Sequence, residues 1–288
     1  VRAQEKGVNS DYRRALVETT YSIAAALAFG LFLYIARGQT AGLEFFSGYL
    51  VEESLSVDNL FVFLLLFDYF QVPLGSQKRV LQWGFLGALA SRGLFIGLGS
   101  VALQNFKPVT LVFAGILLYS SLQLLLENDD DDENLEDNAI VKFAAQLIET
   151  SDKYDGDKFF TKLDDGRKVA TPLFLALVCI EISDVLFAVD SVPAVFGVTK
   201  DPLIVFTSNM FAILGLRSLY TVLSTAVQDL KYLQPAVALI LGFVGAKLVA
   251  EYFGMDVGTA ESLAVILSLL GGGIGLSLYE KNNAKEEA

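Results

Sequence analysis

The chain has 288 residues, 53% of them apolar, and its mean hydropathy is positive. Residues 127–170 hold 14 acidic and 6 basic side chains, which account for −8 of the net charge of −12, so nucleic acid is not an expected partner. The sequence contains no histidine and one cysteine, Cys179, which excludes an internal disulfide and leaves zinc- or copper-type sites without ligands.

Apolar blocks of about 20 residues or more are long enough to cross a bilayer as helices, and they predict an all-α polytopic membrane protein. Eight such spans are expected, at residues 18–36, 44–70, 79–103, 108–126, 172–196, 203–226, 235–253 and 260–279. They form a single membrane domain (1–288) with an acidic soluble loop (128–170) and a last helix with its tail (253–288). Within the loop, a short amphipathic helix is expected at 140–148, and a small hairpin at 159–171.

Charged landmarks recur in the same order in two parts of the chain. Arg92 follows Asp58 by 34 residues and Arg217 follows Asp184 by 33, and each arginine is followed by a glutamate after a further 35 or 34 residues. This spacing predicts a three-helix repeat, at 44–127 and 171–252. Because a copy of three helices reverses direction, the two copies should form an inverted repeat, as in many secondary transporters.

The distribution of lysine and arginine predicts the orientation of the chain. The tails and the connections on their side of the membrane hold 15 of the 21 basic residues, whereas the opposite side holds Arg37, Lys107 and Lys200. Both termini and the acidic loop should therefore face the cytoplasm-like compartment. Because the chain begins at Val1, we expect that an upstream targeting segment has been removed.

Two of the spans carry carboxylates, each of which costs about 2.5–3.5 kcal/mol inside a membrane. The predicted ligands are Glu52, Asp58, Asn59, Glu181, Asp184 and Asp190. Such an all-oxygen set suits a hard divalent cation, namely Mn²⁺, Mg²⁺ or Ca²⁺. Arg92 and Arg217 would then serve as counter-charges when the ion leaves. The alternative is that these acids and arginines are salt bridges that only fix helix packing.

Two expectations concern the geometry of this site. Pro193 cannot donate a hydrogen bond to Val189, so the helix should break near Asp190 and turn this side chain toward the other carboxylates. If the repeat is inverted, Asp58 and Asp184 should approach each other near the midplane of the bilayer.

Three strings, VEESLSVDNLFVFLLLFDYFQVP, EISDVLFAVDSVPAVF and NMFAILGLRSLY, closely resemble the signatures of the TerC family within the LysE-type transporter superfamily. The resemblance covers nearly all of residues 15–280. It implies manganese export through an acidic midplane site made of the six ligands above, with Glu53 as the alternative to Glu52. The first string looks most like plastid members of the family, which implies a thylakoid location with stromal termini and a role in thylakoid biogenesis and membrane-protein insertion.

The expected function is that of a secondary transporter for Mn²⁺, with Ca²⁺ and Mg²⁺ as alternatives, coupled to protons through the same carboxylates. No enzyme activity and no bound cofactor are expected, and the partners are the lipid bilayer and the transported cation. The competing function is that of a biogenesis factor acting on a membrane-protein insertion machine through the soluble loop.

Overall fold

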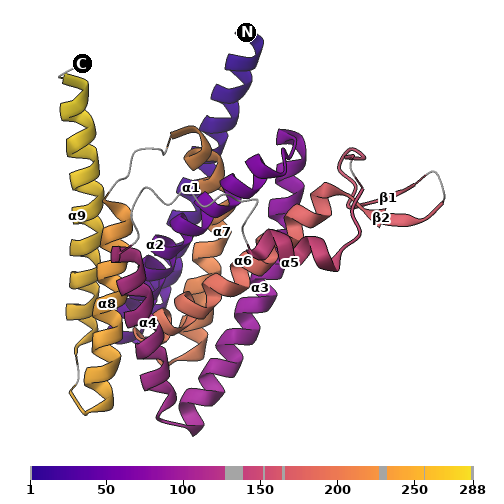
Figure 1. Cartoon of the computed structure of the whole chain (residues 1–288). Coiled ribbons are helices and arrows are strands. Elements are labelled where there is room, and N and C mark those ends of the chain that lie inside the picture. Colours follow the sequence, from indigo (N-terminus) through magenta and orange to yellow (C-terminus); the bar gives the residue numbers. More distant parts are fainter. Residues whose placement is uncertain are drawn as a thin grey trace. The chain divides into compact units, whose positions relative to one another are not determined.

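The computed structural model of the chain describes residues 2–126, 139–151, 153–163, 166–226, 232–255 and 257–286. Nearly all of these residues lie in α-helices, with one small two-stranded sheet (Figure 1). The elements are α1 (Arg2–Arg37), α2 (Gln39–Tyr69), α3 (Leu74–Asn105), α4 (Val109–Leu126), α5 (Ala139–Leu147), β1 (Phe160–Lys162), β2 (Lys168–Ala170), α6 (Pro172–Phe196), α7 (Pro202–Ala226), α8 (Leu233–Tyr252) and α9 (Thr259–Glu286). The predicted all-α class is confirmed.

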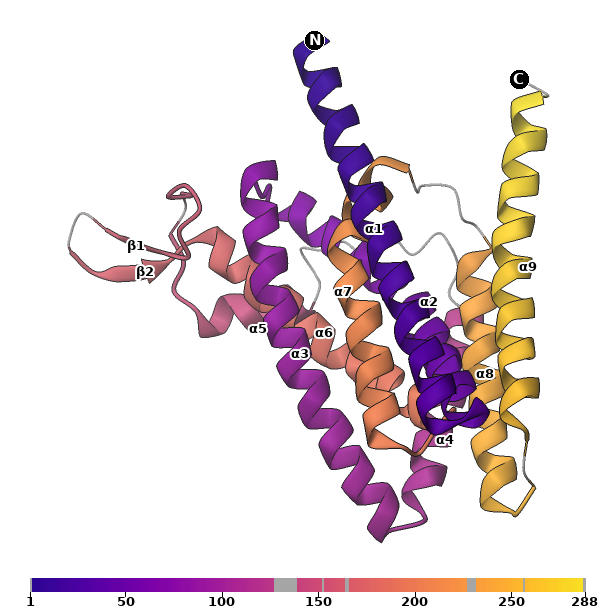
Figure 2. The same cartoon turned by 180° about the vertical axis from the view of Figure 1, so that it is seen from behind.

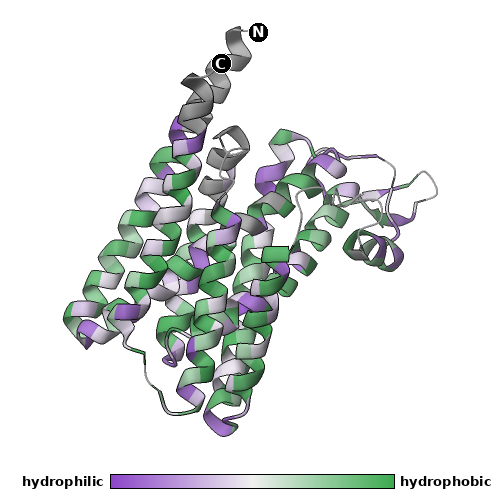
Figure 3. Ribbon diagram, turned by 60° about the vertical axis from the view of Figure 1, so that its left-hand side comes forward, coloured by the Kyte–Doolittle hydropathy of each residue, from purple (hydrophilic) through white to green (hydrophobic). Residues whose placement is uncertain are grey.

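Within the described residues, six helices are long and apolar enough to cross a membrane: α1, α3, α4, α6, α8 and α9. Hydrophobic residues cover most of the long helices and hydrophilic residues interrupt them at few positions (Figure 3). The other two expected spans form the long helices α2 and α7. Of these, α2 carries five acidic side chains, and the described apolar part of α7, Pro202–Gly215, is shorter. The chain is therefore a polytopic helical membrane protein.

The chain divides into two compact units. The first consists of Val1–Asp58, Gly93–Glu127 and Val189–Ala288, and the second of Asn59–Arg92 and Asn128–Ala188. Helices α2, α3 and α6 contribute residues to both. These units differ from the predicted three-helix copies, and the inverted relation between the copies stays a prediction.

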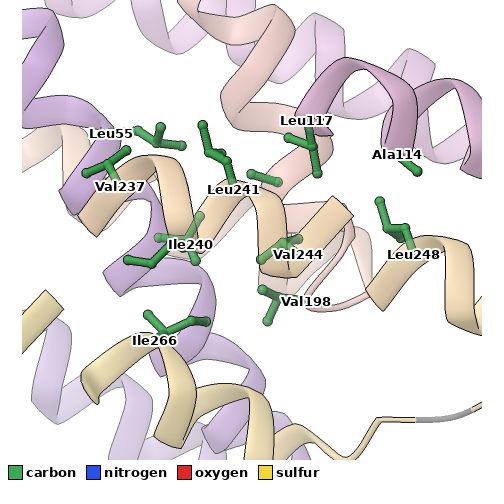
Figure 4. Packing of buried hydrophobic residues seen from close by; sticks show 12 residues of the cluster. Leu55, Ala114, Leu117, Val198, Val237, Ile240, Leu241, Val244, Leu248 and Ile266 are labelled. Carbon is green, nitrogen blue, oxygen red and sulfur yellow. The ribbon is translucent and has the colours of Figure 1, made fainter. Parts of the chain in front are cut away.

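The core of the first unit forms around α8, which packs against α4 and α9. Leu117 of α4 and Val198, which follows α6, are buried with Val244 of α8 (Figure 4). Close approach depends on small residues, because a Cβ added at Gly242 of α8 would lie 2.8 Å from Oγ of Ser121 of α4. Helices α4 and α8 are the third helices of the two predicted copies, so an inverted repeat would pair them in this way.

A second apolar cluster of the first unit joins α1 to α7, which lie side by side (Figure 2). Phe29 of α1 lies between Phe211 of α7 and Phe45 of α2, at centroid distances of 4.9 and 5.2 Å. Aromatic pairs at such distances stabilise a contact by about 0.5–1.5 kcal/mol beyond the area that they bury. Although α1 was expected to lie outside the repeat, it is thus anchored to helices of both copies.

The expected helix break near Asp190 is wrong, because α6 continues as one α-helix through Pro193 to Phe196. Pro193 lies in the last turn of the helix. The missing bond to Val189 therefore interrupts the ladder only near its end, where the helix is about to stop, and the carbonyl of Pro193 still accepts a bond from the Gly197 amide.

The soluble loop belongs to the second unit. Helix α5 is amphipathic, and β1 and β2 pair antiparallel with Phe160 opposite Ala170, so the predicted helix and hairpin are confirmed. The hydroxyl of Tyr154 donates a hydrogen bond of 2.6 Å to the Phe70 carbonyl at the end of α2, and Arg79 of α3 lies over the ring of Phe159. Residues 127–138, which open the predicted acidic loop, lie outside the described residues.

Two groups of the loop have pKa values that reflect this packing. Burial raises the pKa of the Tyr154 hydroxyl, because its charged form would lose solvation. Hydrogen bonds from Lys158 and Thr161 lower the pKa of the Asp155 carboxyl. The stabilisation from Asp155 is therefore present above its unfolded-state pKa and is lost as the pH falls through the lower folded-state value.

Gly273→Ala should destabilise the contact of α9 with α8. A Cβ at Gly273 would lie 2.7 Å from both the Ala236 Cβ and the Tyr232 carbonyl oxygen, and such overpacking costs about 1–3 kcal/mol. The measurement is the free energy of unfolding in mixed micelles. Gly271→Ala on the same helix is the matched control, because nothing lies within 4 Å of its added Cβ. Equal stabilities of the two variants would contradict the packing.

Candidate functional site

A buried ion pair lies in the second unit, between α3 and α6. Nη2 of Arg92 lies 3.3 Å from Oδ1 of Asp184, and the side chains are 1% and 5% exposed. Oγ of Ser91 lies 3.5 Å from the other carboxylate oxygen. Two apolar spans therefore hold opposite charges away from water, where neither charge would be tolerated alone.

Glu181 extends this site by one turn of α6. Glu181 and Asp184 are three residues apart and so share a face of the helix. The carboxylate of Glu181 lies against Gly87 of α3, where an added Cβ would come within about 2 Å of it. Two carboxylates of α6 thus face residues 87–92 of α3. This segment supplies the guanidinium of Arg92, the hydroxyl of Ser91 and, at Gly87, space that no side chain fills.

Asn59 also belongs to the second unit and is buried. Its Nδ2 finds no hydrogen-bond partner in the part of the chain that the structure describes. In the first unit, the hydroxyl of Ser56 on the same helix is likewise buried and has no partner among the described residues. Buried polar atoms without partners are rare in folded proteins and are a feature of sites that await a ligand or water.

The first unit holds three of the other carboxylates. Glu52 is fully buried. Its neighbour Glu53 lies near Gly215 of α7, because a Cβ added at Gly215 would lie 3.8 Å from Oε1 of Glu53. Asp190 is half-buried and accepts a hydrogen bond of 2.8 Å from Ser120 of α4.

The predicted site is thus described only in part. The side chains of Asp58 and Arg217 lie outside what the structure describes, so the approach of Asp58 to Asp184 and the symmetric role of Arg217 stay predictions. Among the described residues, no three histidine, cysteine, aspartate or glutamate side chains are grouped closely enough to hold a metal ion. The six-residue ligand set also stays a prediction.

Sequence reasoning missed three residues that contact these acids: Gly87, Ser91 and Ser120. The signal that could have found the first two is their spacing from each other. Positions 87 and 91 are four apart and therefore share a face of α3. Ser120 has no such local signal, because its partner, Asp190, is 70 residues away.

Removing one partner of the buried pair should cost much more than removing both. Arg92→Met leaves Asp184 buried without this partner and should lower the free energy of unfolding by about 3–5 kcal/mol, whereas Arg92→Met with Asp184→Leu should recover most of the loss. The control is the more exposed pair of Arg37 and Asp201, at 2.8 Å, where Arg37→Met should cost less than about 1 kcal/mol. Additive effects of the two substitutions would show that the pair is not coupled.

Comparisons with known proteins identify the family of the chain. The model of the family described as "Integral membrane protein TerC family" matches residues 37–285. The thylakoid membrane protein TERC, chloroplastic, of Arabidopsis thaliana is 48% identical over 94% of this chain and 70% of its own length. An uncharacterised membrane protein of Myxococcus xanthus is 43% identical over 95% and 85% of the two chains. The putative membrane-bound redox modulator Alx of Escherichia coli (strain K12) is 39% identical over 89% and 80%. No solved structure matches the chain.

With its membrane helices and a family match over most of its length, the chain belongs to the TerC family of integral membrane proteins.

Proposed function

We propose that this protein is a secondary transporter that moves a divalent cation, Mn²⁺, through carboxylates in its membrane helices. The observation that carries the proposal is the buried contact of Arg92 with Asp184, beside which Glu181 supplies a second carboxylate. A pair that only fixed helix packing would need one acid for one base. Here α6 presents two acids to one arginine of α3, which leaves negative charge for a cation to neutralise.

The exchange of counter-charges gives a transport cycle. A divalent cation that binds the two carboxylates of α6 neutralises both charges and displaces the proton that one of them carries. When the cation leaves, the low-dielectric interior does not tolerate bare carboxylates, so Arg92 balances one and a proton joins the other. Export of the cation would thereby be coupled to protons without a histidine.

A second candidate function is that of a thylakoid biogenesis factor, and the exposed side of α5 favours it. Phe143 and Leu147, one helical turn apart, are 54% and 65% exposed. Such a stripe suits a membrane-protein partner of the insertion or assembly machinery. The plant relative is named a thylakoid membrane protein. We accordingly propose a thylakoid location, with both termini and the loop on the stromal side.

Gly87→Ala should abolish Mn²⁺ uptake by purified protein in liposomes while leaving the fold intact. The new methyl group would occupy the place of the Glu181 carboxylate, which is the mobile end of a side chain and can move away. All charges are kept, so only the position of one carboxylate changes. Gly97→Ala, on the same helix with nothing within 4 Å of the added Cβ, should transport normally.

The proposal fails if Gly87→Ala and Asp184→Asn both transport Mn²⁺ at the rate of the unchanged protein. Measuring the uptake of Ca²⁺ and Mg²⁺ in parallel with that of Mn²⁺ would establish the ion selectivity. A pH gradient across the liposome membrane should drive Mn²⁺ uptake. If the gradient has no effect on uptake, proton coupling is ruled out but cation transport is not.

Phe143→Ser with Leu147→Ser should separate the two functions. The exposed stripe of α5 is removed but the buried residues Val141 and Ala144 are kept, so the loop should fold and liposomal Mn²⁺ transport should persist. Accumulation of thylakoid membrane proteins in plants that carry only this variant is the second measurement. Normal accumulation would contradict the assembly role, and loss of transport would contradict the separation.

A further inference from the structure

A cavity of about 490 Å³ lies entirely within the first unit and is separate from all the carboxylates considered above. It forms where the start of α2, the end of α6 with the residues that follow it (196–200), the end of α8 and the start of α9 meet. The end of α8 and the start of α9 can be followed in Figure 1. This volume is within the range of about 300–1,000 Å³ that is usual for small-molecule sites.

Lys247 of α8 lines this cavity and is 5% exposed. Within the described residues its one ion pair is with Oε1 of Glu251, at 3.8 Å, which is too long for a hydrogen bond. Glu251 is held by a closer partner, since Nζ of Lys200 lies 2.9 Å from its other oxygen. The ammonium group of Lys247 therefore has hydrogen-bond capacity left, and it faces the cavity. Because the nearest described carboxylate oxygen is 3.8 Å away, an anionic group in the cavity would stabilise this ammonium group.

Glu44 of α2 supplies the opposite charge to the same cavity. The hydroxyl of Thr199 donates a hydrogen bond of 2.6 Å to its Oε2 and fixes the side chain. Among the described residues no lysine or arginine lies within ion-pair distance of Glu44. Its charge is thus held in place but not neutralised, and it is not paired with Lys247 across the cavity.

A ligand with a single charge would fit this cavity badly. A divalent cation at Glu44 and Glu251 would meet two ammonium groups, those of Lys200 and Lys247. A simple anion at Lys247 would share the cavity with two carboxylates. A ligand with both charges would satisfy Glu44 and Lys247 together.

Exposed apolar side chains next to the cavity indicate which class of ligand carries both charges. Tyr252, Phe253 and Met255, at and just after the end of α8, are 41%, 71% and 61% exposed. Aromatic residues at the end of a membrane span lie at the level of lipid headgroups. The anionic end of the ligand would then be a phosphate.

We propose that this cavity binds a phosphoethanolamine-type zwitterion, with its phosphate at Lys247 and its ammonium group at Glu44. The source is either a membrane lipid headgroup or a soluble phosphodiester. The proposal does not depend on cation transport, because none of the proposed transport carboxylates lines the cavity.

The test is isothermal titration of the full chain with glycerophosphoethanolamine. Ethanolamine and dimethyl phosphate, which each carry one of its two charges, should bind at least about tenfold more weakly, because each satisfies only one side of the cavity. Lys247→Met and Glu44→Gln should each weaken binding of the zwitterion by about tenfold or more. Lys107→Met, which removes an exposed lysine, is the matched control and should change nothing.

Nanodiscs distinguish the two sources of the ligand. In discs made of phosphatidylcholine alone the soluble probe should bind. In discs that contain phosphatidylethanolamine, loss of probe binding would assign the site to the lipid headgroup, and retained binding would assign it to a soluble zwitterion. The proposal is overturned if the zwitterion binds no better than its separate halves, or if neither variant changes its affinity. Tight Mn²⁺ binding that Glu44→Gln removes would overturn it as well.

Discussion

A charge inside a bilayer has to find its counter-charge within the protein, and in this chain that constraint acts on the contact of α3 with α6. Arg92 and Asp184 are almost completely excluded from water, and each stabilises the charge of the other. Their attraction fixes which face of α3 meets α6. It also explains the residues around them, since Gly87 leaves space for the carboxylate of Glu181 and Ser91 approaches Asp184 from the arginine's side. A pair of apolar side chains could also hold these helices together. The two charges of Arg92 and Asp184 therefore indicate a role beyond helix packing.

The helices of the first unit are held together by a different means. In lipid, apolar side chains gain little from meeting one another rather than lipid tails, so close backbone approach and good packing matter more. Gly242 and Gly245 of α8 meet Ser121 and Leu117 of α4, and Gly273 of α9 meets Ala236 of α8. Helix α8 thus has small residues on both of its packed sides. Its charged residues, Lys247 and Glu251, come in its last turns, where the cavity gives them access to polar groups.

The sequence was sufficient for the class and the helices because hydrophobic length determines both. All eight expected spans correspond to helices whose ends differ by a few residues, apart from the longer outer ends of α1 and α9. It was misleading at Pro193, because a proline in the last turn of a helix costs little, and pattern alone does not show where the last turn is. It could not reveal the contact of Ser120 with Asp190 or the neighbours of Lys247. Those depend on packing between helices that lie far apart along the chain.

The soluble loop and the ion pair depend on the same stretch of α3. The loop packs on Arg79 and Trp83 through Phe159, and the same helix then carries Gly87, Ser91 and Arg92. Residues 79–92 span about 20 Å of continuous helix at 1.5 Å per residue. On the other side, β2 ends at Ala170 and α6 begins at Pro172, so the hairpin leads directly into the helix of Glu181 and Asp184. A partner that held the loop would therefore constrain both helices of the pair. Assembly and transport would then share one piece of structure, because the surface available to a partner and the charges available to a cation belong to the same two helices.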